Sequence, residues 1–378
     1  MRGAAVSARV VLLVTGLSPG GAETQVLHLA RELRGRGWEV SVVSLMGKLK
    51  HEPGGACFSL PICSLEMRPG VPDPRAMARM AILLNRLRPH ILHSHLFHAN
   101  LAVRMARLWC PAPVVVSSLH SMAESGRASQ RIWLRDLAYR VTDPLADCTT
   151  AVSQAAGERH AAARAVPRSK LRIIPNGVDT AAFRPAPERR ARARERLGLE
   201  GVFVWLAAGR LMWKKDFATL LRACAALRGS VLLIAGEGPQ EEELRRLARD
   251  LAVDARFLGH VAEMPELMNA ADALALSSVV EGLPMVLLEA AASGLPAVAT
   301  DCGGVGEIVR DGETGFLVPP RDPAAMAAAM SKLVALRPAG REAMSRAARE
   351  HAARFDLAAI ASQWESLYRE LLERARWT

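Results

Sequence analysis

The sequence predicts an α/β protein with two domains, on three observations. The chain has 378 residues, a length that suits two domains. Short apolar runs of strand length alternate with segments of helical periodicity, which is the pattern of parallel α/β sheets. The composition shifts at Pro185-Ala-Pro187 and in the arginine-rich run 188–196, where we place the linker. We therefore expect one domain over residues 1–185 and a second over residues 186–355.

The charge balance indicates an anionic partner. The chain has 49 Lys and Arg against 38 Asp and Glu, a net charge of +11, and its pI is about 10.0. Nucleic acid, a nucleotide ligand or an anionic membrane surface would each suit this charge. The arginines are spread over predicted helices, aromatic residues make up 4% of the chain, and no nucleic-acid-binding motif is present. We therefore expect no nucleic acid partner.

The cysteine spacing and the hydropathy indicate the cellular compartment of the protein. The six cysteines form no C-x-x-C pair and no metal-binding spacing, so we expect reduced thiols. The longest apolar run near the start, Val10–Val14, is far shorter than the ~20 residues of a spanning helix. No signal-peptide cleavage site follows it. We expect a cytoplasmic protein that is soluble or lies on the membrane surface.

The most informative stretch is Glu281-Gly-Leu-Pro-Met-Val-Leu-Leu-Glu289. It follows the apolar run Ala271–Leu276, so it is expected to be the loop and helix after a buried strand. Ligands of open α/β sheets bind at this edge. Pro284 suits the first helical position, and the free N–H groups of a first turn favour an anion. The two carboxylates and this helix start suit an elongated ligand with hydroxyls and phosphate, such as a sugar nucleotide.

The N-terminal stretch has the opening pattern of a phosphate-binding βαβ unit. The apolar run Arg9–Thr15 is followed by the glycine-rich turn Gly16–Gly21 and a predicted helix over Ala22–Arg34. Such a turn accepts a phosphate or allows a ligand to approach the backbone. The turn does not match G-x-G-x-x-G, so a dinucleotide site is not predicted.

Histidines gather at the ends of two predicted strands. His93, His95 and His98 follow the apolar pair Ile91–Leu92, and His120 follows the run 114–117 by a short loop. The first three could bind a metal, but no carboxylate or cysteine nearby in sequence completes a set. The simpler interpretation is that they are polar residues at strand ends that face a cleft.

A basic amphipathic segment lies between these strands and the second domain. Residues 127–140 contain Arg127, Arg131, Arg135 and Arg140 beside apolar residues that include Trp133. Such a helix can lie on an anionic membrane, or it can be a solvated helix packed on the sheet.

Taken in order, these motifs resemble the retaining glycosyltransferases of family four, which have the GT-B fold. The resemblance covers nearly the whole chain and rests on Gly20–Glu23, Ile174–Asp179, Gly209–Leu211 with Lys215, Gly236–Pro239, and the pair Glu281 and Glu289. It implies two Rossmann-like domains whose parallel sheets face across a cleft. Residues 1–185 would bind the acceptor and be closed by helix 356–378, and residues 186–355 would bind a nucleotide-diphosphate sugar.

The resemblance also implies roles for two cations. Arg210 and Lys215 would grip the diphosphate of the donor. This suits their chemistry, because the leaving nucleotide gains negative charge as the glycosidic bond breaks.

The remaining site residues follow from the same resemblance. Glu281 and the N–H groups of Gly282 and Leu283 would hold the sugar and phosphate, and Glu289 would accept hydrogen bonds from ribose hydroxyls. In the first domain, His120 would lie near the donor sugar, and Gly20 and Gly21 would let their loop approach the donor phosphate. The implied catalytic set is thus His120, Arg210, Lys215 and Glu281.

The sequence departs from the family pattern at one position and lacks one motif. Asp216 stands where the family often has glycine after the lysine. No D-x-D motif is present, so we expect no metal and no other cofactor, and Arg210 and Lys215 would take the role of the metal.

We therefore expect a retaining, metal-independent transferase, with a nucleotide sugar as donor. The charge and the 127–140 segment favour a lipid-linked or surface-polysaccharide acceptor and a peripheral position on the inner membrane face. Two alternatives stay open: a transferase for a soluble small acceptor, and a non-catalytic scaffold that binds sugar nucleotides or membranes. The donor sugar, the nucleotide base and the oligomeric state do not follow from the sequence.

Overall fold

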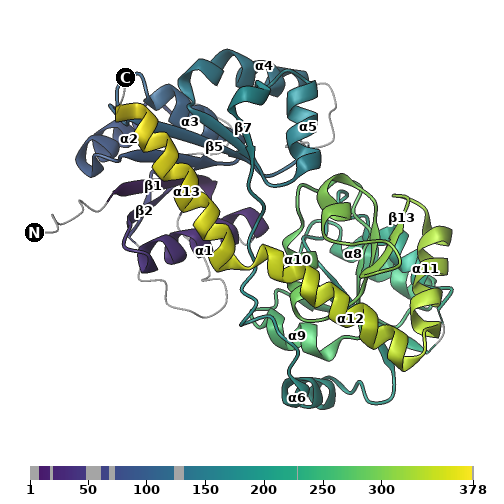
Figure 1. Ribbon diagram of the computed structural model, residues 1–378. Coiled ribbons are helices and arrows are strands. Elements are labelled where there is room, and N and C mark those ends of the chain that lie inside the picture. The colour runs from purple at the N-terminus through teal and green to yellow at the C-terminus, as the bar shows by residue number, and fades with distance from the viewer. Residues whose placement is uncertain are drawn as a thin grey trace, which may run out of the picture. The chain divides into compact units, whose positions relative to one another are not determined.

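The chain folds as two compact units (Figure 1). The computed structural model describes residues 8–17, 20–47, 61–67, 73–122, 132–227 and 229–376. Unit 1 comprises Met1–Gly177 together with Leu357–Thr378, and unit 2 comprises Val178–Asp356. Each unit has its own parallel sheet and its own hydrophobic core.

Unit 1 is built on a seven-stranded sheet with the order β3-β2-β1-β4-β5-β6-β7. Its strands are β1 (Arg9–Gly16), β2 (Glu39–Met46), β3 (Ile62–Ser64), β4 (Ile91–His95), β5 (Val114–Leu119), β6 (Cys148–Ala151) and β7 (Leu171–Ile173). All neighbouring strands pair in parallel. The central strands β4 and β5 are buried throughout, as expected for a sheet covered by helices on both faces.

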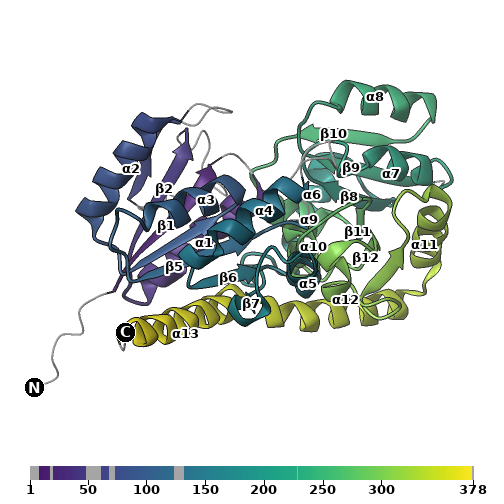
Figure 2. The ribbon, with the colours of Figure 1, turned by 90° about the horizontal axis from the view of Figure 1, so that it is seen from above.

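Helices cover both faces of this sheet. They are α1 (Gly21–Gly35), α2 (Pro74–Leu87), α3 (Phe97–Ala106), α4 (Ile132–Thr142), α5 (Gln154–Ala162) and α13 (Leu357–Arg376). One core cluster joins β1 to α1 and α13, and a second joins the same strand to α2 and α3. The helix α13 packs along α1, although more than 300 residues separate them in sequence (Figures 1 and 2).

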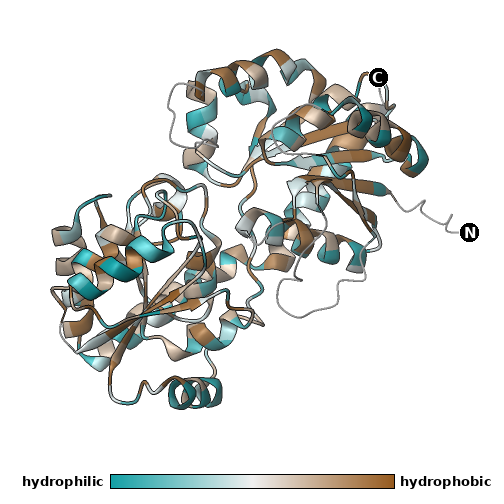
Figure 3. Cartoon of the chain, turned by 180° about the vertical axis from the view of Figure 1, so that it is seen from behind, coloured by the Kyte–Doolittle hydropathy of each residue, from teal (hydrophilic) through white to brown (hydrophobic). Residues whose placement is uncertain are grey.

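Unit 2 is built on a six-stranded parallel sheet with the order β10-β9-β8-β11-β12-β13. Its strands are β8 (Phe203–Ala208), β9 (Ser230–Ala235), β10 (Ala255–Gly259), β11 (Ala273–Leu276), β12 (Ala297–Thr300) and β13 (Gly315–Val318). The strands of both sheets are largely apolar (Figure 3). This pattern of continuous apolar runs is what the sequence led us to expect of parallel strands, and the α/β fold class is confirmed.

The helices of unit 2 are α6 (Pro187–Leu197), α7 (Phe217–Cys224), α8 (Glu241–Asp250), α9 (Met264–Ala270), α10 (Met285–Ala292), α11 (Pro323–Ala335) and α12 (Pro338–Ala352). The helices α7 and α8 pack side by side next to β9 (Figure 2). No helix within the described part of the chain is long and apolar enough to cross a bilayer.

The two units divide between Gly177 and Val178, eight residues before the boundary that the composition indicates. The arginine-rich run 188–196 is not a linker, because it forms α6 and packs on α9 within unit 2. Arg190 and Arg194 of this helix both bind the Asp272 carboxylate, with N···O distances of 2.5 and 3.2 Å. The arginines of α6 therefore fix the helix to its own unit.

We predict that Asp272→Asn lowers the free energy of unfolding by about 2 kcal/mol, because the Asp272 carboxylate accepts charged hydrogen bonds from both arginines and one from the Val204 N–H (2.8 Å). Denaturant unfolding would measure it. The same exchange at Asp254, which is 57% exposed and 3.6 Å from Arg256, is the control. Equal effects of the two exchanges would contradict this account of α6.

Candidate functional site

The sequence-predicted residues of unit 2 gather at one end of its sheet. The strand order runs outward in opposite directions from β8 and β11, so the loops after these two neighbouring strands diverge. In open α/β sheets, the crevice at such a switch point is where ligands bind. The two loops and the helix after the second one carry Arg210, Lys215, Glu281, Gly282, Leu283 and Glu289.

An ion pair joins the two loops. The Lys215 Nζ lies 2.5 Å from Glu281 Oε1, and the two side chains are 21% and 13% exposed. The Ser278 hydroxyl donates to the same Glu281 oxygen at 2.6 Å. The Ser277 hydroxyl donates to the Lys215 carbonyl oxygen at 2.8 Å, so the backbones of the loops are also tied. The predicted cation and carboxylate are therefore held beside each other at the switch point.

Arg210 lies in the same loop as Lys215, but no described residue holds its side chain in an ion pair. Its side chain is exposed, and it makes no hydrogen bond or ion pair with any described residue. An exposed guanidinium in the same loop as a tied ammonium gives this edge of unit 2 a cation that can meet a ligand without first breaking a contact with a described residue.

The backbone at Asp216 explains the departure from glycine. This residue has a φ of 45°, in the left-handed region that glycine adopts freely and that Asp tolerates better than most residues. Its carboxylate accepts a hydrogen bond from the Thr219 hydroxyl at 2.8 Å and caps α7. Asp216 thus keeps the turn that follows Lys215 and adds a helix cap.

Glycines allow the Lys215 loop to touch the loop after β9. A Cβ atom on Gly236 would lie 2.1 Å from the Gly209 carbonyl oxygen, and one on Gly238 would lie 2.3 Å from the Leu211 carbonyl oxygen. The Leu211 N–H also donates to the Glu237 carbonyl oxygen at 2.9 Å. The glycines of the Gly236–Pro239 motif are therefore required by the close approach of two backbones.

The helix α10 starts one residue later than expected, because Pro284 is its N-cap and not its first residue. Glu289 follows on this helix with its side chain partly buried, and it makes no side-chain hydrogen bond with any described residue. Loss of solvation raises the pKa of the Glu289 carboxyl to about 7. A carboxylate that is costly to ionise and has no hydrogen-bond partner among the described residues is suited to accept hydrogen bonds from a ligand.

In unit 1, the switch point lies between β1 and β4. Gly20 is the N-cap of α1 and Gly21 its first residue, directly after the loop that leaves β1. The Glu23 side chain folds back over Gly20, since a Cβ atom there would lie 2.5 Å from its Oε2. His120 follows β5, two strands away in the same sheet.

His120 is held by a second histidine. The His95 Nδ1 and His120 Nε2 atoms are 2.9 Å apart. His95 is buried, and its Nε2 has no hydrogen-bond partner among the described residues. Burial lowers the pKa of His120 to about 4 and that of His95 well below its ordinary value, so both rings are neutral near pH 7. The other ring nitrogen of His120, Nδ1, makes no hydrogen bond with a residue that the structure describes.

The expectation that His93 and His95 face a cleft is wrong, because both are buried in unit 1. His93 binds the Tyr368 hydroxyl at 2.6 Å and the Ser118 hydroxyl at 2.7 Å. Its ring also stacks on Trp364, with centroids 4.5 Å apart. His93 therefore connects the strands to α13.

Sequence reasoning found neither Tyr368 nor Ser278 as a partner of a site residue. Tyr368 lies 275 positions from the histidine that it binds. The only available signal for Ser278 was its position at the end of a predicted strand. The described residues contain no group of three or more His, Cys, Asp and Glu side chains that could hold a metal ion.

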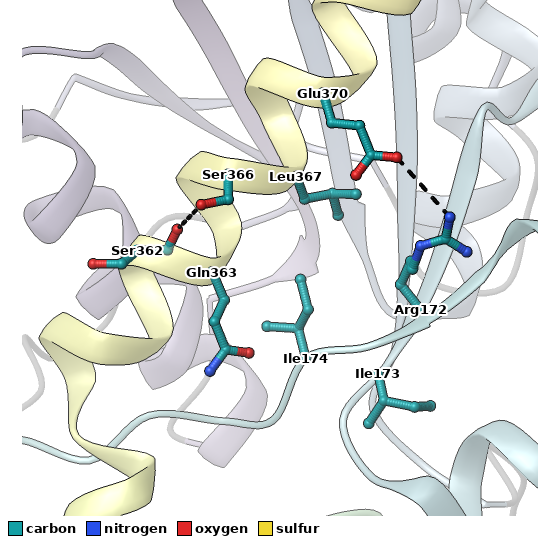
Figure 4. A pocket seen from close by; sticks show the side chains of 8 residues that line it. All are labelled: Arg172, Ile173, Ile174, Ser362, Gln363, Ser366, Leu367 and Glu370. Atoms are coloured by element: carbon teal, nitrogen blue, oxygen red, sulfur yellow. Dashed lines mark hydrogen bonds and ion pairs between the residues drawn. The ribbon is translucent and has the colours of Figure 1, made fainter.

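One pocket of about 390 Å³ lies elsewhere in unit 1 (Figure 4). Its walls come from the edge strand β7 with the residue after it, and from α13, where Arg172 and Glu370 approach to 4.0 Å. None of the sequence-predicted site residues lines it. It is therefore separate from the loops described above.

Family models match most of the chain. The model of glycosyltransferase family 4 matches residues 19–182, and that of the glycosyl transferases group 1 matches residues 202–335. A glycogen synthase of Mycobacterium tuberculosis is 31% identical over 399 residues, which span 92% of this chain and 91% of that protein. The chain therefore belongs to glycosyltransferase family 4, as its motifs indicated.

Two further similarities concern part of the chain and the fold. A GDP-mannose-dependent α-(1-6)-phosphatidylinositol monomannoside mannosyltransferase of Mycolicibacterium smegmatis is 40% identical over 205 residues, which span 50% of this chain and 53% of that protein. The crystal structure of Anabaena HepE in complex with UDP-glucose has a TM-score of 0.81 at 23% identity, with 95% of this chain and 99% of that chain covered. The predicted GT-B fold is confirmed.

We predict that Glu289 makes stability depend on pH in a defined direction. Its pKa in the folded chain, about 7, is higher than the ordinary value of 4.5. The contribution of Glu289 to the free energy of unfolding is therefore complete at acidic pH and is lost as the pH rises through 7. The melting temperature of wild type, relative to that of Glu289→Gln, should fall between about pH 5 and pH 8.

Differential scanning calorimetry across this range would measure the effect. The same exchange at Glu342, which is 71% exposed, controls for the loss of a carboxylate as such. A difference between wild type and Glu289→Gln that stays constant with pH would show that Glu289 ionises as freely as a surface carboxylate.

Proposed function

We propose that this chain is a retaining, metal-independent glycosyltransferase that moves a sugar from a nucleotide-diphosphate sugar to an acceptor hydroxyl. The observation that carries the proposal is the arrangement at the switch point of unit 2, where Lys215, tied to Glu281, lies in the same loop as the exposed Arg210. Family membership fixes the reaction class, and this arrangement suggests where the donor binds.

The two cations suit the bond that breaks. When the bond between the sugar C1 and the diphosphate oxygen cleaves, its electron pair stays on the leaving nucleoside diphosphate. Arg210 and Lys215 would stabilise that charge, because fixed cations aimed at developing charge lower the barrier. The acceptor oxygen forms the new bond to C1, and its proton passes to the leaving diphosphate oxygen. No metal is required where two side-chain cations meet the diphosphate.

The other residues are assigned to the remaining parts of the donor. Glu281 and the backbone N–H groups of Gly282 and Leu283 would hold the sugar and the phosphate at the start of α10. The Glu289 carboxylate, which has no hydrogen-bond partner in the described part of the chain, would accept hydrogen bonds from the ribose hydroxyls. In unit 1, His120 would meet the donor sugar with its remaining ring nitrogen, and Gly20 and Gly21 would let the β1 loop approach the phosphate.

The comparisons support a nucleotide-diphosphate sugar without naming one. The HepE structure holds UDP-glucose, and the mannosyltransferase is named as dependent on GDP-mannose. That enzyme is also named for phosphatidylinositol monomannoside, which supports our proposal of a lipid-linked or surface-polysaccharide acceptor and a peripheral position at the inner membrane face. Retention of the anomeric configuration rests on the family resemblance alone.

A soluble acceptor is the second candidate. The glycogen synthase, which matches 92% of this chain, is named for the synthesis of glycogen, a polysaccharide without a lipid. Transfer to a soluble glycan or sugar phosphate, with no turnover on lipid-linked acceptors, would favour this candidate.

The proposal is tested by thermal shift with a panel of nucleotide sugars in the presence of a chelator. A donor that binds the folded chain raises its melting temperature by mass action. We predict that one donor stabilises wild type, and that Arg210→Ala weakens its binding roughly 10- to 100-fold, because a charge-assisted hydrogen bond contributes about 1.5–3 kcal/mol. Glu289→Ala should also weaken it. Arg222→Ala, at an exposed arginine of α7, is the matched control.

Three results would count against the proposal. No stabilisation by any nucleotide sugar would leave a scaffold as the better interpretation. Equal effects of Arg210→Ala and Arg222→Ala on donor binding would indicate that the donor binds away from the switch point. A need for a divalent cation would contradict metal independence. With a donor and acceptor in hand, the anomeric configuration of the product, read by NMR, tests retention.

A further inference from the structure

Among the residues that the structure describes, the exposed large apolar side chains are confined to unit 1. Within the described part of the chain, eight are more than a third exposed, and none of them belongs to unit 2. One lies on α2 and the others lie on α4 or at the end of α3: Ile82, Met105, Leu108, Trp109, Trp133, Leu134, Leu137 and Val141. Single exposed apolar residues are ordinary, but a concentration of this kind marks an interaction surface.

The helix α4 has its apolar side turned outward. Trp133, Leu137 and Val141 are four residues apart and share one face, where they are 60%, 42% and 68% exposed. The side that packs on the unit carries Tyr139, which is buried in a core cluster, and Asp136, which is buried in a two-bonded ion pair with Arg159 at 2.6 and 2.8 Å. A helix that packs on a core normally buries its apolar side. The outward side of α4 is therefore suited to a partner.

The exposed residues share one face of the sheet. The helices α2 and α3 supply Met80 and Val103 to one core cluster. The helix α4 packs beside α3, where the Arg104 guanidinium donates to the Tyr139 carbonyl oxygen at 3.0 Å and to the Thr142 hydroxyl at 3.2 Å. We call the outer surface of these three helices, together with residues 107–109, the α2–α4 face.

The net charge of the chain also belongs to unit 1. This unit has 26 Lys and Arg against 14 Asp and Glu, a net charge of +12, whereas unit 2 has 23 against 24, a net charge of −1. No Asp or Glu occurs from residue 74 to residue 123. On the three helices of the α2–α4 face, the one acidic residue is the ion-paired Asp136, and Arg75 and Arg86 are exposed on α2. This face combines apolar and basic side chains without exposed acids.

We propose that unit 1 docks through the α2–α4 face onto an anionic lipid bilayer. Trp133, Leu137 and their exposed apolar neighbours would enter the interfacial region, where tryptophan is favoured. The exposed arginines would meet the phosphates of the headgroups. The inference rests on the proposed function in one respect, which is that a docked enzyme would meet a lipid-linked acceptor. The α2–α4 face itself is independent of the proposed donor site.

This face differs from the basic stripe that the sequence suggested. Arg127 and Arg131 lie outside the described residues. Arg135 is partly buried with its guanidinium 4.7 Å from the ring centroid of Phe97. Arg140 donates to two backbone carbonyls at 2.9 Å each. The proposed contact therefore depends on the apolar side of α4 and the arginines of α2.

Charge favours a bilayer over a second copy of the chain. A two-fold contact between copies brings the same patch of both chains together, so arginine would face arginine. Like charges repel, and no acidic side chain is exposed on the three helices to offset this. An anionic bilayer supplies the opposite charge over the whole face.

Co-flotation with vesicles of phosphatidylcholine, with and without phosphatidylglycerol, tests the proposal on the full chain. We expect wild type to float with the anionic vesicles and much less with the neutral ones. Trp133→Gln with Leu137→Gln, and separately Arg75→Glu with Arg86→Glu, should each lower the partition coefficient by on the order of tenfold. All four positions are on the surface, so folding should be preserved.

The control variant carries Arg246→Glu with Arg249→Glu on α8 of unit 2, where both side chains are exposed. It changes the net charge as much as the α2 variant does and should bind vesicles like wild type. Failure of wild type to float, or equal loss in the α2 and α8 variants, would overturn the proposal. A dimer that Trp133→Gln with Leu137→Gln dissociates, without vesicle binding, would instead identify a self-association surface.

Donor binding, measured on the same proteins by thermal shift, separates this proposal from the proposed function. Nucleotide-sugar binding without flotation would overturn the membrane surface alone. Flotation without nucleotide-sugar binding would overturn the donor site alone.

Discussion

The ion pair between Lys215 and Glu281 is the contact on which the proposed donor site depends. It joins the loops after β8 and β11, which start at the same end of the sheet and then diverge. The Lys215 loop is in turn held against the loop after β9 by the close approach of Gly209 and Gly236. Three loops are thus fixed to one another before any ligand binds. Such preorganisation lowers the ordering cost of binding and places charge where it must act.

In unit 1, a chain of contacts holds a neutral histidine, His120, at the end of a strand. His120 contacts the buried His95, whose ring lies 4.0 Å from that of His93. His93 binds Tyr368 of α13, so the last helix of the chain contributes to the environment of a loop after β5. Burial keeps these rings uncharged, and a neutral imidazole can accept or donate one hydrogen bond without carrying charge into the site.

The sequence was sufficient where a local pattern decides the structure. The alternation of apolar runs and helices predicted both parallel sheets, and the glycine, cation and carboxylate motifs predicted which loops of unit 2 come together. The linker was misplaced because the composition shift at Pro185–Pro187 and in the run 188–196 falls on α6, a helix of unit 2 in which two arginines bind Asp272. Which side of α4 faces outward could not be predicted, because its buried side carries a carboxylate, Asp136, whose partner Arg159 lies on another helix.

The most direct test of the account is nucleotide-sugar binding by a variant in which the central pair is reversed, Lys215→Glu with Glu281→Lys. The reversed pair can still join the two loops, so the account predicts a melting temperature close to that of wild type. It also predicts that calorimetric titration detects no nucleotide-sugar binding, because a carboxylate would then stand where the diphosphate needs a cation. Binding with the affinity of wild type would show that the pair only holds the fold together, and would contradict the proposed donor site.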